Sequence, residues 1–133
     1  MVAVTSGAAV GVDVERVQTL SDLDMLTGTV LAPSERAALD GLADGERTWA
    51  FFVTWTRKEA LLKATGDGLG LGPGGVVFGP PSGPPRLDRW PSDAPDPGPL
   101  RLLDLDAGPG HTASLAVLTE SPVTPVLVTP VPT

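Results

Sequence analysis

The chain has 133 residues, a length that fits one domain with a modest core. Its formal net charge of −7 argues against binding to nucleic acid or to an anionic membrane, because both need a basic face. The absence of cysteine excludes disulfides, thiolate metal ligands and cysteine nucleophiles. The apolar N-terminus lacks the basic region of a signal peptide, and no run approaches the ~18 apolar residues of a membrane span. We therefore expect a cytoplasmic protein.

Two β-prone runs near the N-terminus, residues 2–5 and 8–15, are separated by Ser6-Gly7 and predict a hairpin. In the second run, valines at positions 10, 12 and 14 alternate with polar or small residues. Because side chains alternate between the two faces of a strand, Asp13 and Glu15 share one face, roughly 7 Å apart. Taken alone, this pattern fits a solvated strand face opposite a valine-lined core better than it fits a site.

Two short helices are predicted next, over residues 21–26 and 33–42. Ser21 and Ser34 are suitable N-cap residues for them. Glu35 would lie in the first turn of the second helix, where a carboxylate interacts favourably with the helix dipole.

The longest predicted element is a helix over residues 46–65, whose apolar positions supply one buried side. Its second half holds the only two lysines of the chain, Lys58 and Lys63, on either side of Glu59. The spacing of Trp55, Glu59 and Lys63 places these residues along one side of the helix. Taken alone, the lysines and Glu59 would form exposed ion pairs that contribute about 0.3 kcal/mol each.

A glycine-dense stretch, residues 66–75, follows the long helix. Its backbone amides could approach a phosphate, but it lacks the Gly-Lys-Ser/Thr ending of a P-loop, so a flexible connection is the preferred interpretation. Residues 79–99 contain eight prolines and few core-forming residues. They predict an irregular surface excursion within a single domain that spans residues 1–133.

Four further strands are predicted in the second half of the chain, at residues 76–78, 100–105, 111–118 and 123–129. Pro125 places the last of them at a sheet edge. His111, the only histidine, is interpreted as a polar residue on the rim of the sheet and not as a catalyst. Asp104 and Asp106 do not form a calcium loop, because the later ligands of such a loop are missing.

The acidic residues of the first strand and of the long helix form a pattern when they are combined. Asp13 and Glu15 share a strand face, and Glu59 follows about 45 residues later. Three converging carboxylates suit a hard divalent cation, first of all Mg²⁺, with water and a substrate phosphate as its other ligands. Lys58 and Lys63 would then contact phosphate oxygens. The cation and the lysines would make the site attractive to anions, although the net charge of the chain is −7.

The segment Gly11-Val12-Asp13-Val14-Glu15, followed by Trp55-Thr56-Arg57-Lys58-Glu59-Ala60-Leu61-Leu62-Lys63, resembles the paired signature of the 4'-phosphopantetheinyl transferases. With Asp-x-Glu on the strand, it is closer to the surfactin-synthetase-activating type than to the holo-acyl-carrier-protein synthase type. The resemblance covers residues from about 1 to 120. Three shorter segments add to it: Pro33-Ser34-Glu35, Gly66-Asp67-Gly68-Leu69 and residues 111–118.

The resemblance implies an α+β fold, in which a small antiparallel sheet packs against one long helix and shorter helices. It also implies an enzyme that transfers 4'-phosphopantetheine from coenzyme A to a serine of an acyl or peptidyl carrier protein and releases 3',5'-ADP. Such an enzyme serves fatty acid, polyketide or nonribosomal peptide biosynthesis.

The resemblance also implies roles for individual residues. Asp13, Glu15 and Glu59 would hold Mg²⁺ on the pyrophosphate of coenzyme A. Glu59, or a water on the metal, would accept the serine proton. Lys63 would neutralise charge on the bridging oxygen and the departing phosphate, and Lys58 would contact coenzyme A.

Glu35 is a further candidate near the metal. Surfactin-type enzymes consist of two similar halves with coenzyme A in the cleft between them, and this chain resembles the second half only. We therefore expect a homo-oligomer or a partner domain to complete the site, with Gly110-His111-Thr112 of a neighbour as one source of the missing contacts.

Two alternatives stay open: a non-catalytic relative that binds carrier proteins or has a structural role, and an unrelated α+β domain.

Overall fold

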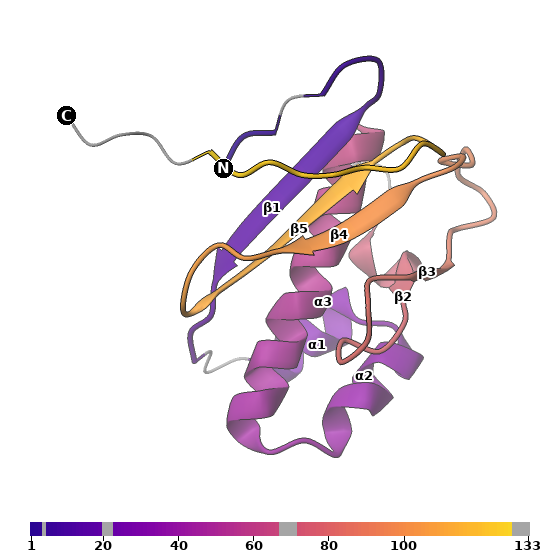
Figure 1. Ribbon diagram of the computed structural model, residues 1–133. Helices are drawn as coiled ribbons and strands as arrows, with labels where there is room; N and C mark the ends of the chain where they lie inside the picture. Colours follow the sequence, from indigo (N-terminus) through magenta and orange to yellow (C-terminus); the bar gives the residue numbers. More distant parts are fainter. Residues whose placement is uncertain (4, 20–22, 67–71, 129–133) are drawn as a thin grey trace.

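The computed structural model describes residues 1–3, 5–19, 23–66 and 72–128 (Figure 1). In chain order, the elements of this part are β1 Val10–Arg16, α1 Leu23–Val30, α2 Pro33–Asp40, α3 Asp44–Thr65, the 3-10 turn η1 Pro73–Gly75, β2 Val77–Phe78, β3 Leu87–Arg89, β4 Arg101–Leu105 and β5 His111–Val117. Within the described ranges, no helix combines the length and the hydrophobicity needed to cross a membrane.

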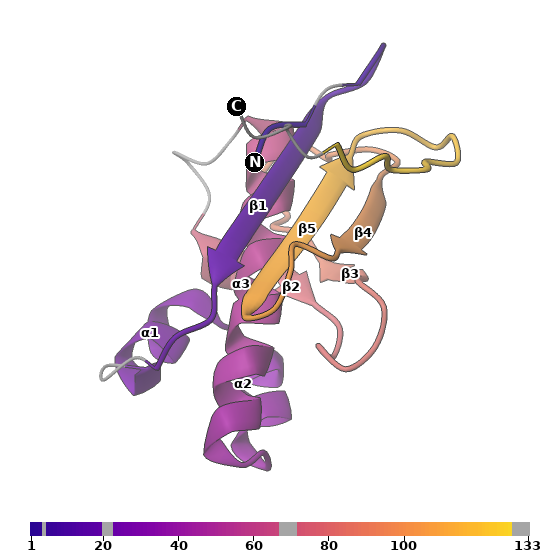
Figure 2. The ribbon, with the colours of Figure 1, turned by 60° about the vertical axis from the view of Figure 1, so that its left-hand side comes forward.

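The elements form two parts around α3. Strands β1, β5 and β4 build an antiparallel sheet with β5 in the middle, and α3 packs across one face of it (Figure 1). The short strands β2 and β3 pair separately. Helices α1 and α2 lie against the N-terminal half of α3, beyond the end of the three-stranded sheet (Figure 2). The predicted α+β fold is therefore confirmed.

The pairing of β1 with β5 decides which face of β1 meets the long helix. Gly11 is opposite Ala116 and Asp13 is opposite Ser114, and all four residues are buried on the side covered by α3. The valines at positions 10, 12 and 14 are only partly buried and face the other way. The interpretation of a valine-lined core opposite a solvated carboxylate face is thus wrong, because α3 covers the carboxylate face.

Gly11 explains how α3 can lie so close to β1. A Cβ atom at Gly11 would lie 2.1 Å from the carbonyl oxygen of Ala60 and 2.4 Å from the backbone nitrogen of Ala64. Both atoms belong to helix backbone, so they cannot move aside as a flexible side chain would. The missing side chain at Gly11 and the small side chains of Ala60 and Ala64 therefore bring residues 59–64 directly against the strand.

The core has two clusters, one on each half of α3. The C-terminal half packs against β2 and β5, and the N-terminal half packs against α1 and α2. In the second cluster, the rings of Phe51 and Phe52 meet edge to face with their centroids 5.5 Å apart. Helix α3 is thus buried along most of its length, which agrees with its prediction from apolar spacing. It ends at Gly66, whose φ of 73° is left-handed.

Both predicted terminal strands are absent from the described residues. Residues 1–3 and 5 are not strand, so the expected hairpin does not form around Ser6-Gly7, and residues 123–128 are not strand either. Instead, the two terminal segments line a cavity of about 530 Å³ together with Val10 and Val12. Pro122 and Pro125 lack the N–H groups that a ladder needs, which explains the second absence.

Two smaller predictions change, and a third is not tested. Helix α2 is capped at Ala32 and not at Ser34, because the chain already turns into the helix at Pro33. Ser21, the other predicted cap, lies outside the described residues. The proline-rich segment 79–99 contains β3, so it is not wholly irregular.

Candidate active site

Four predicted site residues meet where β1 passes the C-terminal half of α3. The Lys63 Nζ lies 2.7 Å from Asp13 Oδ1. The indole Nε1 of Trp55 donates a hydrogen bond to Glu15 Oε1 at 3.3 Å. Glu59 lies one helical turn before Lys63 and on the same flank of α3, where it interacts electrostatically with Asp13 and Lys63. The packing of α3 on Gly11 therefore assembles Asp13, Glu15, Glu59 and Lys63 from two distant parts of the chain.

Burial and the charge of Asp13 disfavour the ionisation of the two glutamates in this cluster. Burial raises the pKa of Glu15, and the adjacent Asp13 raises it further. The pKa of Glu59 is also raised, first by burial and then by the charge of Asp13, while Lys63 acts in the opposite direction. One ammonium group thus compensates only part of the negative charge of three carboxyl groups.

The cluster also contains an unpaired polar atom that fits a cation. Asp13 is almost fully buried, with its side chain 7% exposed, and its Oδ2 atom has no hydrogen-bond partner. A buried carboxylate oxygen without a donor is costly, and a divalent cation would satisfy it. The hard oxygen donors of Asp13, Glu15 and Glu59 are the type that Mg²⁺ prefers.

The cluster does not have the geometry of a complete metal-coordination site. In the part of the chain that the structure describes, no group of three or more Asp, Glu, His or Cys side chains is positioned to hold a metal ion. The Lys63 ammonium lies on Oδ1 of Asp13, where it takes one of the oxygens that a cation would use. The assignment of Asp13, Glu15 and Glu59 as metal ligands therefore stays a prediction.

Lys58 is buried, so the structure contradicts its predicted contact with coenzyme A. Its side chain is 0% exposed, and its Nζ donates to Glu35 Oε1 at 2.6 Å, to the Val30 carbonyl at 2.8 Å and to the Pro73 carbonyl at 2.7 Å. These three bonds use all three N–H groups of the ammonium. Burial lowers the pKa of Lys58, and the contact with Glu35 opposes this shift. Lys58 therefore holds α3 to the segments around Val30 and Pro73.

Glu35 is the buried partner of Lys58 and is not free to bind a metal. Its Oε1 also accepts a hydrogen bond from the Ala32 N–H at 2.8 Å, and its Oε2 accepts one from the Phe78 N–H at 2.8 Å. The spacing of the helix could have indicated this role, since Lys58 lies four residues after buried Thr54 and three before buried Leu61. A lysine on the buried side of a helix needs a buried acidic partner.

A second ion pair, not predicted from the sequence, connects α3 to β4. Arg57 is 2% exposed, and its Nε and Nη2 atoms donate to Asp104 at 3.0 and 2.6 Å. The same Nη2 donates to the carbonyl of Gly83 at 2.9 Å, which attaches the 79–99 segment to the sheet. Asp104 therefore has a structural partner. His111 is exposed at the start of β5, as predicted for a rim residue.

Removal of the Glu59 charge is expected to stabilise the protein when divalent cations are chelated. The folded pKa of Glu59 is raised, so the stability that this carboxyl contributes is fully present below its unfolded pKa near 4.5 and is lost as the pH rises through the folded value. Glu59→Gln should therefore raise the free energy of unfolding at pH 7, by about 0.5 kcal/mol at this partly exposed site. At pH 5 the gain should be smaller.

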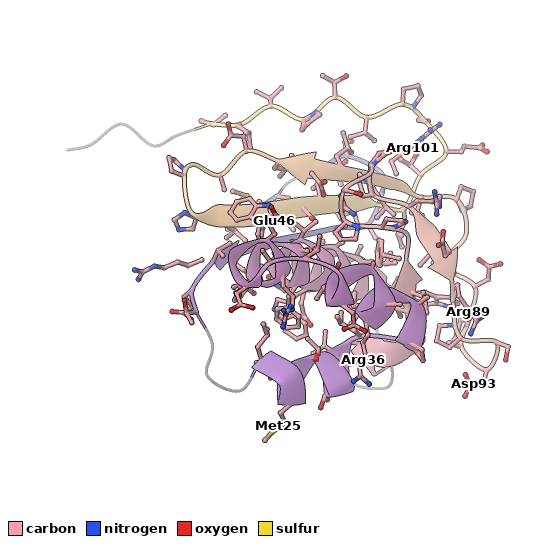
Figure 3. All side chains as sticks on the ribbon, turned by 90° about the horizontal axis from the view of Figure 1, so that it is seen from below. Met25, Arg36, Glu46, Arg89, Asp93 and Arg101 are labelled. Carbon is pink, nitrogen blue, oxygen red and sulfur yellow. The ribbon has the colours of Figure 1, made fainter. Side chains whose placement is uncertain are left out.

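Urea unfolding with chelator at pH 5 and pH 7 measures both differences. Glu46→Gln, the same change at an exposed position in the first turn of α3 (Figure 3), is the matched control. A Glu59→Gln variant less stable than the parent at pH 7 would show that Glu59 is not repelled by its neighbours.

Comparison with known proteins connects this cluster to a family. The family described as ACPS, the 4'-phosphopantetheinyl transferase superfamily, matches residues 9–102. The 4'-phosphopantetheinyl transferase HetI of Nostoc sp. is 43% identical over 60 residues, which are 45% of this chain and 25% of HetI. The putative 4'-phosphopantetheinyl transferase slr0495 of Synechocystis sp. is 32% identical over 77 residues, which are 58% of this chain and 31% of that protein. The matches thus span only about a quarter to a third of the length of these curated relatives.

Two solved structures share the fold. The holo-[acyl-carrier-protein] synthase (AcpS) of Thermotoga maritima is 25% identical with a TM-score of 0.61, over 83% of this chain and 62% of that one. The Chronobacterium ammoniagenes ACPS-CoA complex is 19% identical with a TM-score of 0.64, over 84% of this chain and 96% of that one, which shows a common fold. The closer likeness to the surfactin-synthetase-activating type stays a prediction. Because the matched residues 9–102 make up most of the chain and include the whole β1–α3 cluster, the protein belongs to the 4'-phosphopantetheinyl transferase superfamily.

Proposed function

We propose that this chain catalyses the Mg²⁺-dependent transfer of 4'-phosphopantetheine from coenzyme A to a serine of an acyl or peptidyl carrier protein. The observation that carries the proposal is the meeting of Asp13, Glu15 and Glu59 beside Lys63, in a chain that belongs to this superfamily. Such a cluster can attract both a divalent cation and a phosphate group, although the chain as a whole is acidic.

In the proposed reaction, the serine Oγ forms a bond to the phosphorus next to the pantetheine arm. The bond from that phosphorus to the bridging oxygen breaks, and 3',5'-ADP leaves. Glu59, or a water on the metal, accepts the serine proton. Lys63, whose side chain is 52% exposed, can reach phosphate oxygens and stabilise the negative charge of the leaving group. Mg²⁺ held by Asp13, Glu15 and Glu59 would neutralise the pyrophosphate and polarise it.

We also propose that a second copy of the chain or a partner domain completes the coenzyme A site. Coenzyme A carries a pyrophosphate and a 3'-phosphate, which need several cationic contacts. Of the two lysines in the chain, Lys58 is fully buried and only Lys63 reaches the surface.

The mass of a purified apo carrier protein tests the proposed activity. After incubation with this chain, coenzyme A and Mg²⁺, the carrier should gain the mass of one phosphopantetheine group, and a chelator should prevent the gain. Sedimentation of the active sample identifies the assembly that works. No gain at any concentration of the chain, although Mg²⁺ binds, would contradict catalysis by this chain and favour a carrier-binding relative without activity.

A further inference from the structure

The ion pair between Lys63 and Asp13 is asymmetric. Asp13 is fixed in β1 with its side chain 7% exposed, whereas Lys63 is 52% exposed and lies in the last turn of α3. The lysine Nζ lies 2.7 Å from Asp13 Oδ1 and 3.5 Å from the Val12 carbonyl oxygen. The acid therefore cannot leave this position without a movement of the strand, while the ammonium can swing into solvent on its flexible stem.

The carboxylate of Asp13 can interact with two cations, the ammonium group of Lys63 and a divalent metal ion. Its Oδ2 is buried without a partner, Glu15 lies two residues further along the same strand face, and Glu59 lies one helical turn before Lys63 on α3. A divalent cation that binds there approaches the ammonium on Oδ1, and the two positive charges repel each other. Cation binding must therefore displace Lys63 or be weakened by it.

We propose that Lys63 couples cation binding to diphosphate binding at this site. Without a divalent cation, Lys63 neutralises Asp13. When the cation binds, Lys63 moves to the phosphate oxygens of the diphosphate, which supply the negative charge that it loses. The cation and the diphosphate then each bind more tightly in the presence of the other, by the same factor. This inference rests on the metal site of the proposed function. It adds that the cation and the diphosphate bind together more tightly than either ligand binds alone.

A static ion pair makes the opposite prediction. If Lys63 served only to hold α3 on β1, it would stay on Asp13 with or without a cation. Replacement of Lys63 would then weaken cation binding or leave it unchanged. The two interpretations therefore differ in the position of one ammonium group and in the sign of one change in affinity.

The lysine content of the chain makes the position of Lys63 measurable. Lys58 and Lys63 are the only lysines, so a protein labelled with ¹³C and ¹⁵N in lysine has two side-chain ammonium signals at most. On titration with Mg²⁺ and inorganic pyrophosphate, the Lys63 signal should shift, because the ammonium changes partner. The signal of Lys58, which is buried with three partners, should stay in place as the internal control. Bound Mg²⁺ with an unchanged Lys63 signal would overturn the coupling.

Affinities of Mn²⁺, used as a paramagnetic substitute for Mg²⁺, give the second readout. Lys63→Met should bind Mn²⁺ alone about three- to tenfold more tightly than the parent chain, since a competing ion pair of this exposure is removed. Pyrophosphate should strengthen Mn²⁺ binding in the parent, after correction for Mn²⁺–pyrophosphate complexes in solution, and much less in Lys63→Met. Arg36→Met removes one positive charge from an exposed position on α2 (Figure 3) and controls for net charge.

The outcomes separate this inference from the metal site itself. If neither the parent nor Lys63→Met binds Mn²⁺, with or without pyrophosphate, the proposed metal site is wrong and the coupling falls with it. If both bind Mn²⁺ and Lys63→Met binds it equally or more weakly, the metal site stands and the coupling is wrong.

Discussion

Gly11→Ala is expected to lower the free energy of unfolding by about 3 kcal/mol, the upper part of the range for overpacked sites. The new Cβ would lie 2.1 Å from the Ala60 carbonyl oxygen and 2.4 Å from the Ala64 nitrogen, both in the backbone of α3. The helix must then shift away from β1, because no side chain can rotate to make room. The same shift would move Glu59 and Lys63 away from Asp13, so cation binding should weaken together with stability.

Urea unfolding and Mn²⁺ titration measure the two effects of Gly11→Ala. Gly28→Ala is the matched control, since Gly28 is exposed in α1 and a Cβ there meets no atom within 4 Å. This control should be neutral or stabilising by up to about 1 kcal/mol, because alanine is the better helix former. A Gly11→Ala protein as stable as the parent would show that α3 does not depend on this close approach.

Asp13→Asn is expected to lower the rate of phosphopantetheine transfer on the order of 10²- to 10³-fold, the size of effect seen when one preorganised electrostatic contact is removed from an active site. Asparagine keeps the shape of the side chain but removes the negative charge at the centre of the cluster. The substitution abolishes the ion pair with Lys63 and weakens any cation site that includes Glu15 and Glu59. The initial rate of mass gain of an apo carrier protein measures the loss.

Asp88→Asn is the corresponding control. Asp88 lies on β3, is exposed, and pairs with Arg86 at the surface. It should leave the transfer rate unchanged. Circular dichroism and the midpoint of thermal unfolding show whether Asp13→Asn keeps the fold. A folded Asp13→Asn protein with the activity of the parent would contradict the role proposed for Asp13.

Local sequence patterns were enough to predict most of the regular structure. The helix expected over residues 46–65 is observed as Asp44–Thr65, and the predicted strands at 100–105 and 111–118 are observed as β4 and β5. These elements are defined by residue spacing within one segment, which a single sequence displays directly. The family and the α+β fold followed from two short motifs, and both are confirmed.

Predictions for the terminal segments were wrong for a physical reason. A β-prone run forms a strand only when another strand offers free N–H and C=O groups in register. Residues 1–3 and 5 do not pair with the free edge of β1, which is an edge strand of the sheet. The segment 123–128 lies beside the valine face without strand pairing, and its Pro125 has no N–H group for a ladder.

The two sequence motifs, through their resemblance to the family, indicated which residues come together in the candidate site. Only the tertiary structure decided what each lysine does. Lys58 is 23 positions from its partner Glu35 and is buried with it, whereas Lys63 lies half exposed on Asp13. The two lysines flank Glu59 in the sequence, one residue before it and four residues after it. Burial and ion pairing depend on the elements packed against each face of a helix, and those elements come from distant parts of the chain.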